Sequence, residues 1–280
     1  MTRLTTADGT TYEVRAGGPR DAGRPPVLFL HGFTGRGADW SPLLRPIRAV
    51  GHRTIVVDLL GHGRSDAPTD PARHAIERQA ADLAEILRRL DATPAFVVGY
   101  SMGSRVALRL AITEPALVRG LILESPSAGI VDARERATRV TADSSLADQI
   151  ERDGLEAFVD DWEALPPFAT ERRLPVAIQA RIRRDRLRNR PDGLAASLRG
   201  AGQGVMEPLV DRLKKEIRCP VLVVAGALDV GGVERAVAIA RRVPSVRMLL
   251  LPERGHAPHR EAPVRFRQIL LDQLSTWSTK

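Results

Sequence analysis

Residues 95–103 read Ala-Phe-Val-Val-Gly-Tyr-Ser-Met-Gly, an apolar run that passes directly into the pattern Gly-x-Ser-x-Gly. A buried strand that ends in this pattern and turns at once into a helix forms a nucleophile elbow. Gly99 and Gly103 lack the Cβ atoms that would collide in so sharp a turn. We therefore expect Ser101 at the apex of the turn, with its hydroxyl exposed near the positive end of a helix.

Short apolar strands alternate with helical stretches on both sides of this turn. Strand-like runs lie at 27–30, 54–57, 95–98, 120–124, 220–225 and 246–251, and helical patterns lie at 40–50, 76–90, from the elbow to about 113, 233–242 and 264–277. This rhythm predicts an α/β fold with a mostly parallel sheet and helices on both faces. Between 127 and 204 the pattern is helical, with no strong strand candidate. We expect a core formed by 1–126 and 205–280 and an inserted helical cap at 127–204.

The composition favours one large cytoplasmic domain. A chain of 280 residues with 43% hydrophobic content can bury an ample core. The N-terminus has no apolar segment of the kind found in signal peptides, and no apolar run approaches the roughly 20 residues of a membrane span. The single cysteine, Cys219, excludes an internal disulfide framework and is expected to be a buried structural thiol.

The net charge of +8 is concentrated in one segment. Residues 172–190 contain eight arginines and one acid, Asp185. Nucleic-acid binding is one reading of such a segment, but neither interleaved aromatic residues nor a recognisable binding motif accompanies it. Arginine forks grip carboxylates in pairs. A small anionic substrate or a solvated helix face explains the segment equally well, and we expect no nucleic-acid or membrane partner.

Two later strands are each followed by a residue that could activate Ser101. A serine hydroxyl needs a histidine to take its proton, and the histidine needs a carboxylate to fix its tautomer. Asp229 and His256 follow the strands at 220–225 and 246–251, in the order Ser…Asp…His that is typical of α/β-hydrolases.

Each of these assignments has an alternative. Asp229 could be the N-cap of the following helix instead, since aspartate is favoured there. Glu124 and Asp58 also end strands and are rival acids. His256 follows a glycine and could be an ordinary surface-loop residue.

Two further features are expected close to the serine. The backbone N–H groups of Phe33 and Met102 are candidates for an oxyanion hole, one from the His-Gly-x loop and one from the residue after the nucleophile. Arg105 follows Ser101 by four residues, one turn along the same helix face. An arginine on a core-packed helix needs an anionic partner, which is either a structural acid or a substrate carboxylate.

Several loops, read together, resemble one family. The motifs are those at 31–35 with 39–40, 58–66, 99–105, 124–130, 135–136 with 139, 194–195 with 197–200, and 255–259. The chain resembles the 2-succinyl-6-hydroxy-2,4-cyclohexadiene-1-carboxylate synthases of menaquinone biosynthesis, which have the α/β-hydrolase fold, over nearly its whole length. Many α/β-hydrolases share the early loops, so the Tyr100-Ser101 pair with Arg105 and the cap motifs are the discriminating part.

The resemblance implies a lyase that eliminates pyruvate from an enolpyruvyl-cyclohexene tricarboxylate, with no cofactor and no metal. The serine of a Ser101–His256–Asp229 triad would act as base, and the oxyanion hole would stabilise the developing enolate. The substrate-binding residues carried over are Tyr100, Arg105, Arg139, Trp162 and Arg186. Three arginines suit three carboxylates. Trp162 has a second interpretation as cap core, and Arg183, Arg184 and Arg188 lie close enough to leave the register of Arg186 open.

Two other functions stay open at this point. The same triad would serve a serine hydrolase of esters, lactones or carbon–carbon bonds. A ligand-binding protein could also keep this fold without turnover. In every case we expect a monomer or a small homo-oligomer.

Overall fold

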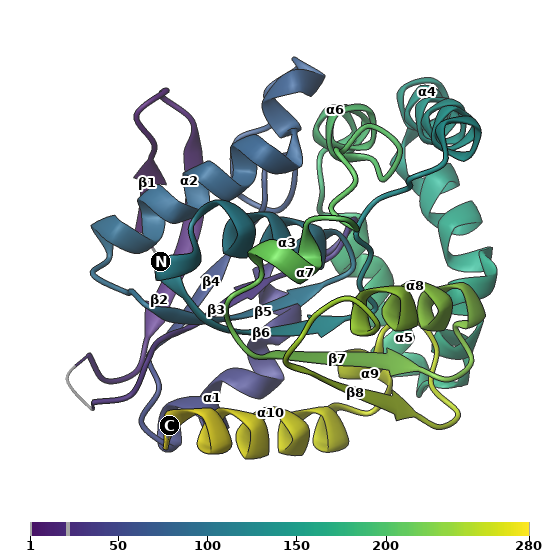
Figure 1. Ribbon diagram of the computed structural model, residues 1–280. Coiled ribbons are helices and arrows are strands. Elements are labelled where there is room, and N and C mark those ends of the chain that lie inside the picture. The colour runs from purple at the N-terminus through teal and green to yellow at the C-terminus, as the bar shows by residue number, and fades with distance from the viewer. Residues whose placement is uncertain (1, 21–22, 280) are drawn as a thin grey trace.

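An eight-stranded sheet runs through the middle of the molecule (Figure 1). The structure is a computed structural model that describes residues 2–20 and 23–279. Strand order is β1-β2-β4-β3-β5-β6-β7-β8; β2 is antiparallel to both neighbours, and strands β3 to β8 are mutually parallel. The strands are β1 (Thr2–Thr5), β2 (Thr11–Gly17), β3 (Val27–Leu30), β4 (Thr54–Val57), β5 (Ala95–Tyr100), β6 (Val118–Glu124), β7 (Val221–Gly226) and β8 (Val246–Leu251). The predicted mostly parallel sheet is confirmed, and the hairpin β1–β2 adds two strands that the sequence pattern did not reveal.

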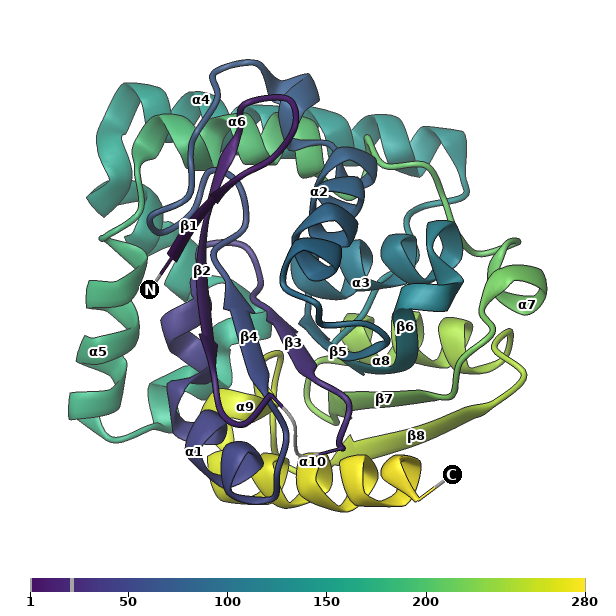
Figure 2. The ribbon, with the colours of Figure 1, turned by 90° about the vertical axis from the view of Figure 1, so that its left-hand side faces the viewer.

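Helices cover both faces of this sheet (Figures 1 and 2). Helices α1 (Ser41–Ala49) and α10 (Pro263–Ser278) pack on one face, and α2 (Ile76–Arg89), α3 (Met102–Thr113) and α8 (Val230–Ala240) on the other. Alternation along β3 explains the division, because Leu28 and Leu30 belong to one apolar cluster while Val27 and Phe29 belong to the other. The remaining short elements outside residues 133–201 are η1 (Gly37–Trp40), η2 (Pro71–His74), η3 (Pro115–Leu117), α7 (Leu213–Glu216) and α9 (Pro258–Glu261).

The chain between β6 and β7 is helical. It contains α4 (Ala133–Ala164), η4 (Pro166–Arg173), α5 (Val176–Arg186) and α6 (Pro191–Ala201), and we call residues 133–201 the cap. Helix α4 breaks its helical geometry at Gly154, where φ is 85°. Helices α4 and α6 run side by side (Figure 2) and enclose an apolar cluster of their own that includes Ile150, Phe158 and Leu198. The cap is therefore packed from within and is not simply a long loop.

The parallel strands deliver their following loops to one edge of the sheet. Ser101 comes directly after β5, Asp229 lies three residues beyond β7, and His256 lies five residues beyond β8. Open α/β sheets place their ligands at this carboxyl edge. Within the described parts of the chain, no helix is both long enough and apolar enough to cross a membrane.

Candidate active site

The turn between β5 and α3 holds Ser101 in a backbone conformation that non-glycine residues rarely adopt. Its φ is 50° and its ψ is −108°. The two glycines of the motif are required by close approach, since a Cβ on Gly99 would lie 2.6 Å from the Gly103 carbonyl oxygen. A Cβ on Gly103 would lie 2.4 Å from the carbonyl oxygen of Leu30. The local sequence thus dictates the sharp turn, and the turn lifts the serine away from the strand.

Three predicted side chains meet through hydrogen bonds at this turn. The Nε2 atom of His256 lies 3.1 Å from the Ser101 hydroxyl oxygen, and its Nδ1 lies 2.6 Å from Oδ2 of Asp229. Burial would raise the pKa of Asp229, but the hydrogen bond and charge of His256 and the N–H of Gly232 outweigh it, so the pKa is held below its usual value. An ionised Asp229 fixes His256 with its Nε2 free to accept the serine proton.

Asp229 satisfies both interpretations that the sequence allowed. Its Oδ2 atom faces His256, while its Oδ1 accepts a hydrogen bond of 3.0 Å from the backbone N–H of Gly232 in the first turn of α8. The residue is therefore an N-cap and a histidine partner at once. Capping fixes the carboxylate, which in turn fixes the imidazole.

The two rival acids are engaged elsewhere. Asp58 accepts hydrogen bonds from the backbone N–H groups of Gly37 and Arg64, at 2.7 and 2.9 Å. Glu124 accepts from the backbone N–H of His259 at 2.7 Å and lies 3.0 Å from its Nδ1. Both carboxylates organise neighbouring loops, and neither bonds to His256 in the described structure.

The loop that carries His256 is held from two directions. The hydroxyl of Ser125 donates to the His256 carbonyl oxygen at 2.8 Å, and the backbone N–H of His256 donates to the carbonyl oxygen of Pro167 at 3.2 Å. Pro167 belongs to η4 of the cap, and the ring of Phe168 stands edge-on to the imidazole with 5.6 Å between ring centroids. The position of His256 therefore depends on how the cap is seated.

The candidate oxyanion hole is available. Phe33 and Met102 both line the same cavity as Ser101. Across residues 2–20 and 23–279, neither backbone N–H donates a hydrogen bond to a protein acceptor. Two free donors beside a serine hydroxyl can stabilise an oxygen on which negative charge develops.

The cavity has a volume of about 400 Å³ and opens from Ser101 toward the cap. Four of the five predicted substrate-binding residues line it, namely Tyr100, Arg105, Arg139 and Trp162. The lining also contains a third arginine, Arg235, and one acid, Asp143. A cavity of this size accommodates a small organic ligand.

Arg105 is a buried cation without an acid partner among the described residues. Its side chain comes from α3, one turn after Ser101, and its Nη1 donates to the carbonyl oxygen of Ala201 at 2.5 Å. Burial, helped by the nearby Arg139, lowers the pKa of Arg105 to about 10, which leaves it charged at neutral pH. The sequence left two possible partners for Arg105, a structural acid or a substrate carboxylate. The described residues provide no structural acid.

Arg139 and the aromatic residues complete the walls. The Nε of Arg139 donates to Asp143 at 2.8 Å, and its Nη1 donates to Oε1 of Gln203 at 2.9 Å. The indole of Trp162 packs between Phe33 and Phe168 at centroid distances of 5.3 Å each and lines the cavity as well. Trp162 is thus both cap core and cavity wall. The neutral phenol of Tyr100, whose pKa burial raises well above the usual value, faces the same space.

Arg186 lies outside the cavity, contrary to the expectation from the resemblance. Its guanidinium donates to Glu163 at 2.9 Å and to Glu171 at 2.8 Å, and its Cζ lies 5.3 Å from the centroid of the Phe168 ring. The residue is 2% exposed and does not line the space around Ser101. Two acids hold the guanidinium behind Phe168, which is the physical reason for the difference.

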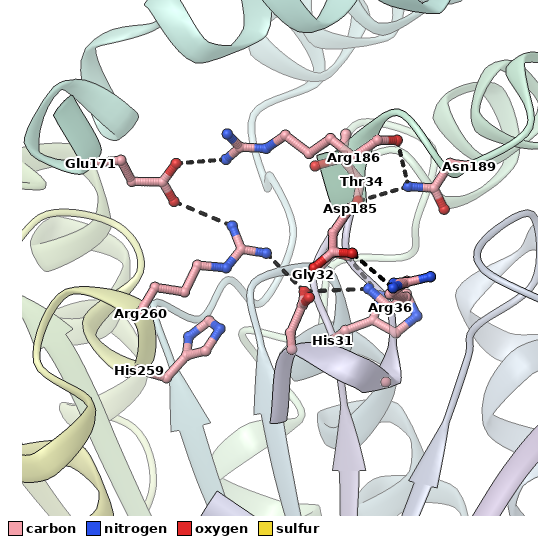
Figure 3. Close-up of polar contacts among 12 residues, drawn as sticks. His31, Gly32, Thr34, Arg36, Glu171, Asp185, Arg186, Asn189, His259 and Arg260 are labelled. Carbon is pink, nitrogen blue, oxygen red and sulfur yellow. Dashed lines mark hydrogen bonds and ion pairs between the residues drawn. The ribbon is translucent and has the colours of Figure 1, made fainter. Parts of the chain in front are cut away.

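Glu171 instead makes Arg186 part of a link between cap and core (Figure 3). Its second oxygen accepts from Nη1 of Arg260 at 3.2 Å. Nη2 of Arg260 in turn donates to Asp39 at 2.8 Å. Glu171 belongs to η4, Arg260 to α9 and Asp39 to η1. A chain of alternating charges thus runs from the cap, past the loop of His256, into the core.

A second set of contacts joins the same two parts of the molecule (Figure 3). Nη2 of Arg36 donates to Asp185 at 2.7 Å, and the side-chain amide of Asn189 donates to the carbonyl oxygen of Thr34 at 2.8 Å. These bonds connect the loop after β3, which carries Phe33, with the end of α5. Part of the arginine-rich segment therefore serves to seat the cap.

Arg235 is the cavity residue that the sequence analysis did not single out. It lies on the second turn of α8, six residues after Asp229. The sequence did contain a signal for this residue. Asp229 caps α8, and a long side chain on the second turn of a helix points back toward the N-terminus and so toward the capping acid.

Comparison with known proteins agrees with this geometry. The family model for the alpha/beta hydrolase fold matches residues 25–263, which defines the class of protein. Within that class, a protein of Bacillus subtilis (strain 168) that is provisionally named 2-succinyl-6-hydroxy-2,4-cyclohexadiene-1-carboxylate synthase is 41% identical over 277 residues, 98% of each chain. The chain therefore belongs to the family of these synthases.

Two solved structures are similar over their full lengths. MenH from S. aureus has a TM-score of 0.89 and 33% identity, with 95% of this chain and 98% of that chain covered. A thermophilic esterase from Thermogutta terrifontis, solved with malate bound, has a TM-score of 0.86 and 26% identity, with 99% and 100% covered. The same scaffold thus occurs both in a synthase family and in an esterase.

Proposed function

We propose that this enzyme eliminates pyruvate from 2-succinyl-5-enolpyruvyl-6-hydroxy-3-cyclohexene-1-carboxylate and releases 2-succinyl-6-hydroxy-2,4-cyclohexadiene-1-carboxylate. The observation that carries the proposal is the Ser101–His256 pair opening into a cavity lined by three arginines and a single acid. A substrate with three carboxylates matches that charge, because arginine–carboxylate pairs are strong and directional. The names of the relatives support the same reaction.

The two ring names define the bond changes. The substrate has its ring double bond at C3=C4 and the enolpyruvyl oxygen on C5, and the product has double bonds at C2=C3 and C4=C5. A proton therefore leaves C2, which is acidic because it is next to the succinyl ketone. The electron pair of the C2–H bond forms C2=C3, the old double bond moves to C4=C5, and the C5–O bond breaks. Enolpyruvate leaves, takes up a proton on carbon and becomes pyruvate.

The residues of the site have matching roles in this scheme. The hydroxyl of Ser101, with His256 accepting its proton, acts as the base toward C2–H, and Asp229 stabilises the imidazolium that forms. The backbone N–H groups of Phe33 and Met102 would stabilise the ketone oxygen as negative charge develops on it. Every step is redox-neutral and moves only protons and electron pairs.

The proposal extends to the organisation of the molecule. The predicted inserted segment, residues 127–204, contains the cap helices at 133–201 and would form a separate unit over a core of 1–126 and 205–280, which the separate apolar cluster within α4 and α6 supports. The protein would act in the cytoplasm as a monomer or small homo-oligomer, and the use of a single cysteine, Cys219, fits a reducing compartment.

Release of pyruvate tests the reaction. We expect wild-type enzyme to release one pyruvate per enolpyruvyl substrate, followed with lactate dehydrogenase and NADH. Ser101→Ala should lower kcat by about 10³-fold or more, on the scale of other triad knockouts. Ser275→Ala, a serine on the exposed side of α10, is the matched control and should keep full activity.

A serine hydrolase is the second candidate, and the similarity to the Thermogutta esterase favours it. In that case Ser101 would attack a carbonyl and form an acyl-enzyme. If the enzyme hydrolyses p-nitrophenyl esters and releases no pyruvate from the enolpyruvyl substrate, it is a hydrolase and the lyase function is wrong. Ligand binding without either turnover would leave a binding protein.

A further inference from the structure

Arg235 presents an uncommitted cation to the cavity of Ser101. Its side chain lines the cavity from α8, and no hydrogen bond or ion pair joins it to any residue that the structure describes. Its guanidinium folds back over the first turn of the helix, where a Cβ on Gly231 would lie 3.1 Å from Nη1. The glycine at this position leaves the space in which the guanidinium lies.

The other two cavity arginines are each already engaged. Arg105 donates to the carbonyl oxygen of Ala201, and Arg139 is shared between Asp143 and Gln203. Arg235 also lines the cavity but differs from both, because its guanidinium forms no hydrogen bond or ion pair with the residues that the structure describes. An arginine with five N–H donors seldom stays without acceptors when it is partly removed from water.

The charges around the cavity do not balance. Three guanidinium groups face one carboxylate in the lining, that of Asp143, and Asp143 is bonded to Arg139. Burial lowers the pKa of Arg235. The nearby Asp229 raises this pKa, and the positive charge of Arg139 lowers it. An anionic group placed between Arg139 and Arg235 would relieve this repulsion.

We infer that Arg235 binds a carboxylate of the substrate and is a third carboxylate-binding arginine beside Arg105 and Arg139. The inference rests on the proposed function, which supplies a ligand with three carboxylates. It assigns to α8 the role that the resemblance gave to Arg186 on α5. The guanidinium and the carboxylate would pair as a fork, with two parallel N–H···O bonds.

A role through Asp229 is the alternative that the test must separate. Asp229 lies close enough for Arg235 to help lower its pKa. Loss of that influence would alter the pH profile of kcat. Loss of that influence would not weaken the binding of one substrate carboxylate in particular. It would also leave Kd unchanged in the Ser101→Ala variant, which has no turnover.

The experiment measures binding and turnover separately. Dissociation constants are determined by calorimetry in the Ser101→Ala background, for the enolpyruvyl triacid and for its three monoamides, each lacking one carboxylate. Arg235→Gln should raise Kd for the triacid about 10- to 100-fold, the usual scale for truncating one side of a partly buried charge pair. Arg235→Lys should restore part of this loss. Arg241→Gln, an exposed arginine just beyond α8 with the same change of charge, should leave Kd within about twofold.

The monoamides identify the contact. If Arg235 pairs with one carboxylate, Arg235→Gln has almost no effect on the monoamide that lacks this group and keeps its effect on the other two. An equal loss for the triacid and all three monoamides, or no loss for any, would overturn the inference.

The outcomes for the proposed function are independent of these. If the wild-type enzyme turns over the triacid and Arg235→Gln leaves Kd unchanged, the inference about Arg235 is wrong and the proposed lyase function stands. If the wild-type enzyme does not turn over the triacid but Arg235→Gln selectively weakens binding, the lyase function is wrong and the carboxylate-binding site stands. A wild-type cavity that does not bind the triacid at all refutes both.

Discussion

Glu171 gives the sharpest test of how the cap is held against the core. Its carboxylate joins Arg186 of the cap to Arg260 of the core, at 2.8 and 3.2 Å, and is only 6% exposed. The variant Glu171→Gln keeps the size and one carbonyl oxygen but removes the negative charge. Two buried guanidinium groups would then face a neutral amide.

The size of the effect follows from what each arginine retains. Removing one partner of a buried ion pair costs about 3–5 kcal/mol when the other charge is left uncompensated. In Glu171→Gln, Arg186 still has Glu163 and Arg260 still has Asp39. We therefore expect a loss of about 2–3 kcal/mol in the free energy of unfolding, below that range because neither cation is stranded. This loss corresponds to a decrease of about 4–10 °C in Tm for a chain of this size.

The effect has a defined pH dependence. Burial would raise the pKa of Glu171, but Arg260 and Arg186 outweigh burial and hold it below its usual value. A lowered folded-state pKa adds stability above the unfolded-state pKa of about 4.3, and this stability is lost as the pH falls through the folded value. The difference between wild type and Glu171→Gln should be constant from pH 8 to about 5.5. It should then narrow below about pH 4.3, by at most 1.4 kcal/mol per pH unit.

Urea unfolding from pH 8 to pH 3 measures this difference, with Glu156→Gln as control. Glu156 is an exposed acid on α4, so its variant should stay within about 0.5 kcal/mol of wild type. An equal stability of wild type and Glu171→Gln at pH 7 would refute the reasoning. So would a difference that grows rather than narrows on acidification, because it would mean that the carboxyl is stabilised in its protonated form.

Three further predictions concern single side chains. Asp229→Asn should keep the N-cap bond to Gly232 and an unchanged circular dichroism spectrum but lose about 10³- to 10⁴-fold in kcat, because the amide no longer selects the right tautomer of His256. Arg105→Ala should lower kcat/KM for the triacid by a factor that corresponds to a loss of about 2–5 kcal/mol in transition-state stabilisation, whereas an unchanged kcat/KM in a folded variant would exclude a carboxylate contact. Burial raises the pKa of Cys219 to about 12, so iodoacetamide at pH 8 should label it slowly in the native protein and quickly in urea.

Five of the six parallel strands could be predicted because both of their faces are buried, and the sixth, the edge strand β8, is only partly buried but has an apolar run. Runs such as Val27–Leu30 and Val221–Gly226 are apolar at nearly every position, which is typical of central parallel strands. The hairpin of β1 and β2 gave no such signal. Strand β1 is an edge strand that is largely exposed, and β2 carries Glu13 and Arg15 between its apolar residues. Such strands depend on their neighbours more than on their own composition.

The side chains around Ser101 could be predicted where a strand end fixes them, and not where a cap helix does. Ser101, Asp229 and His256 follow strand ends that the sheet aligns. Arg186 lies on a helix with arginines on several sides, and which of them faces the cavity depends on how α5 is set against the core. The deciding partners, Glu163 and Glu171, are 23 and 15 residues away in the sequence. No local pattern reveals such a pairing.

The electrostatics of the cavity and the chemistry proposed for Ser101 support each other. Burial and, to a smaller extent, the positive charge of Arg139 lower the pKa values of both Arg105 and Arg235, so the cavity without an anion disfavours the charged guanidinium groups. A polyanionic ligand counters this effect on binding. As the C2 proton leaves, the added negative charge develops in the same positive field, beside two free backbone N–H donors. The site therefore favours the enolate over the neutral ketone, whereas an ester without carboxylates would gain from the N–H donors alone. This difference is the physical ground for placing elimination ahead of hydrolysis on a scaffold that can support both.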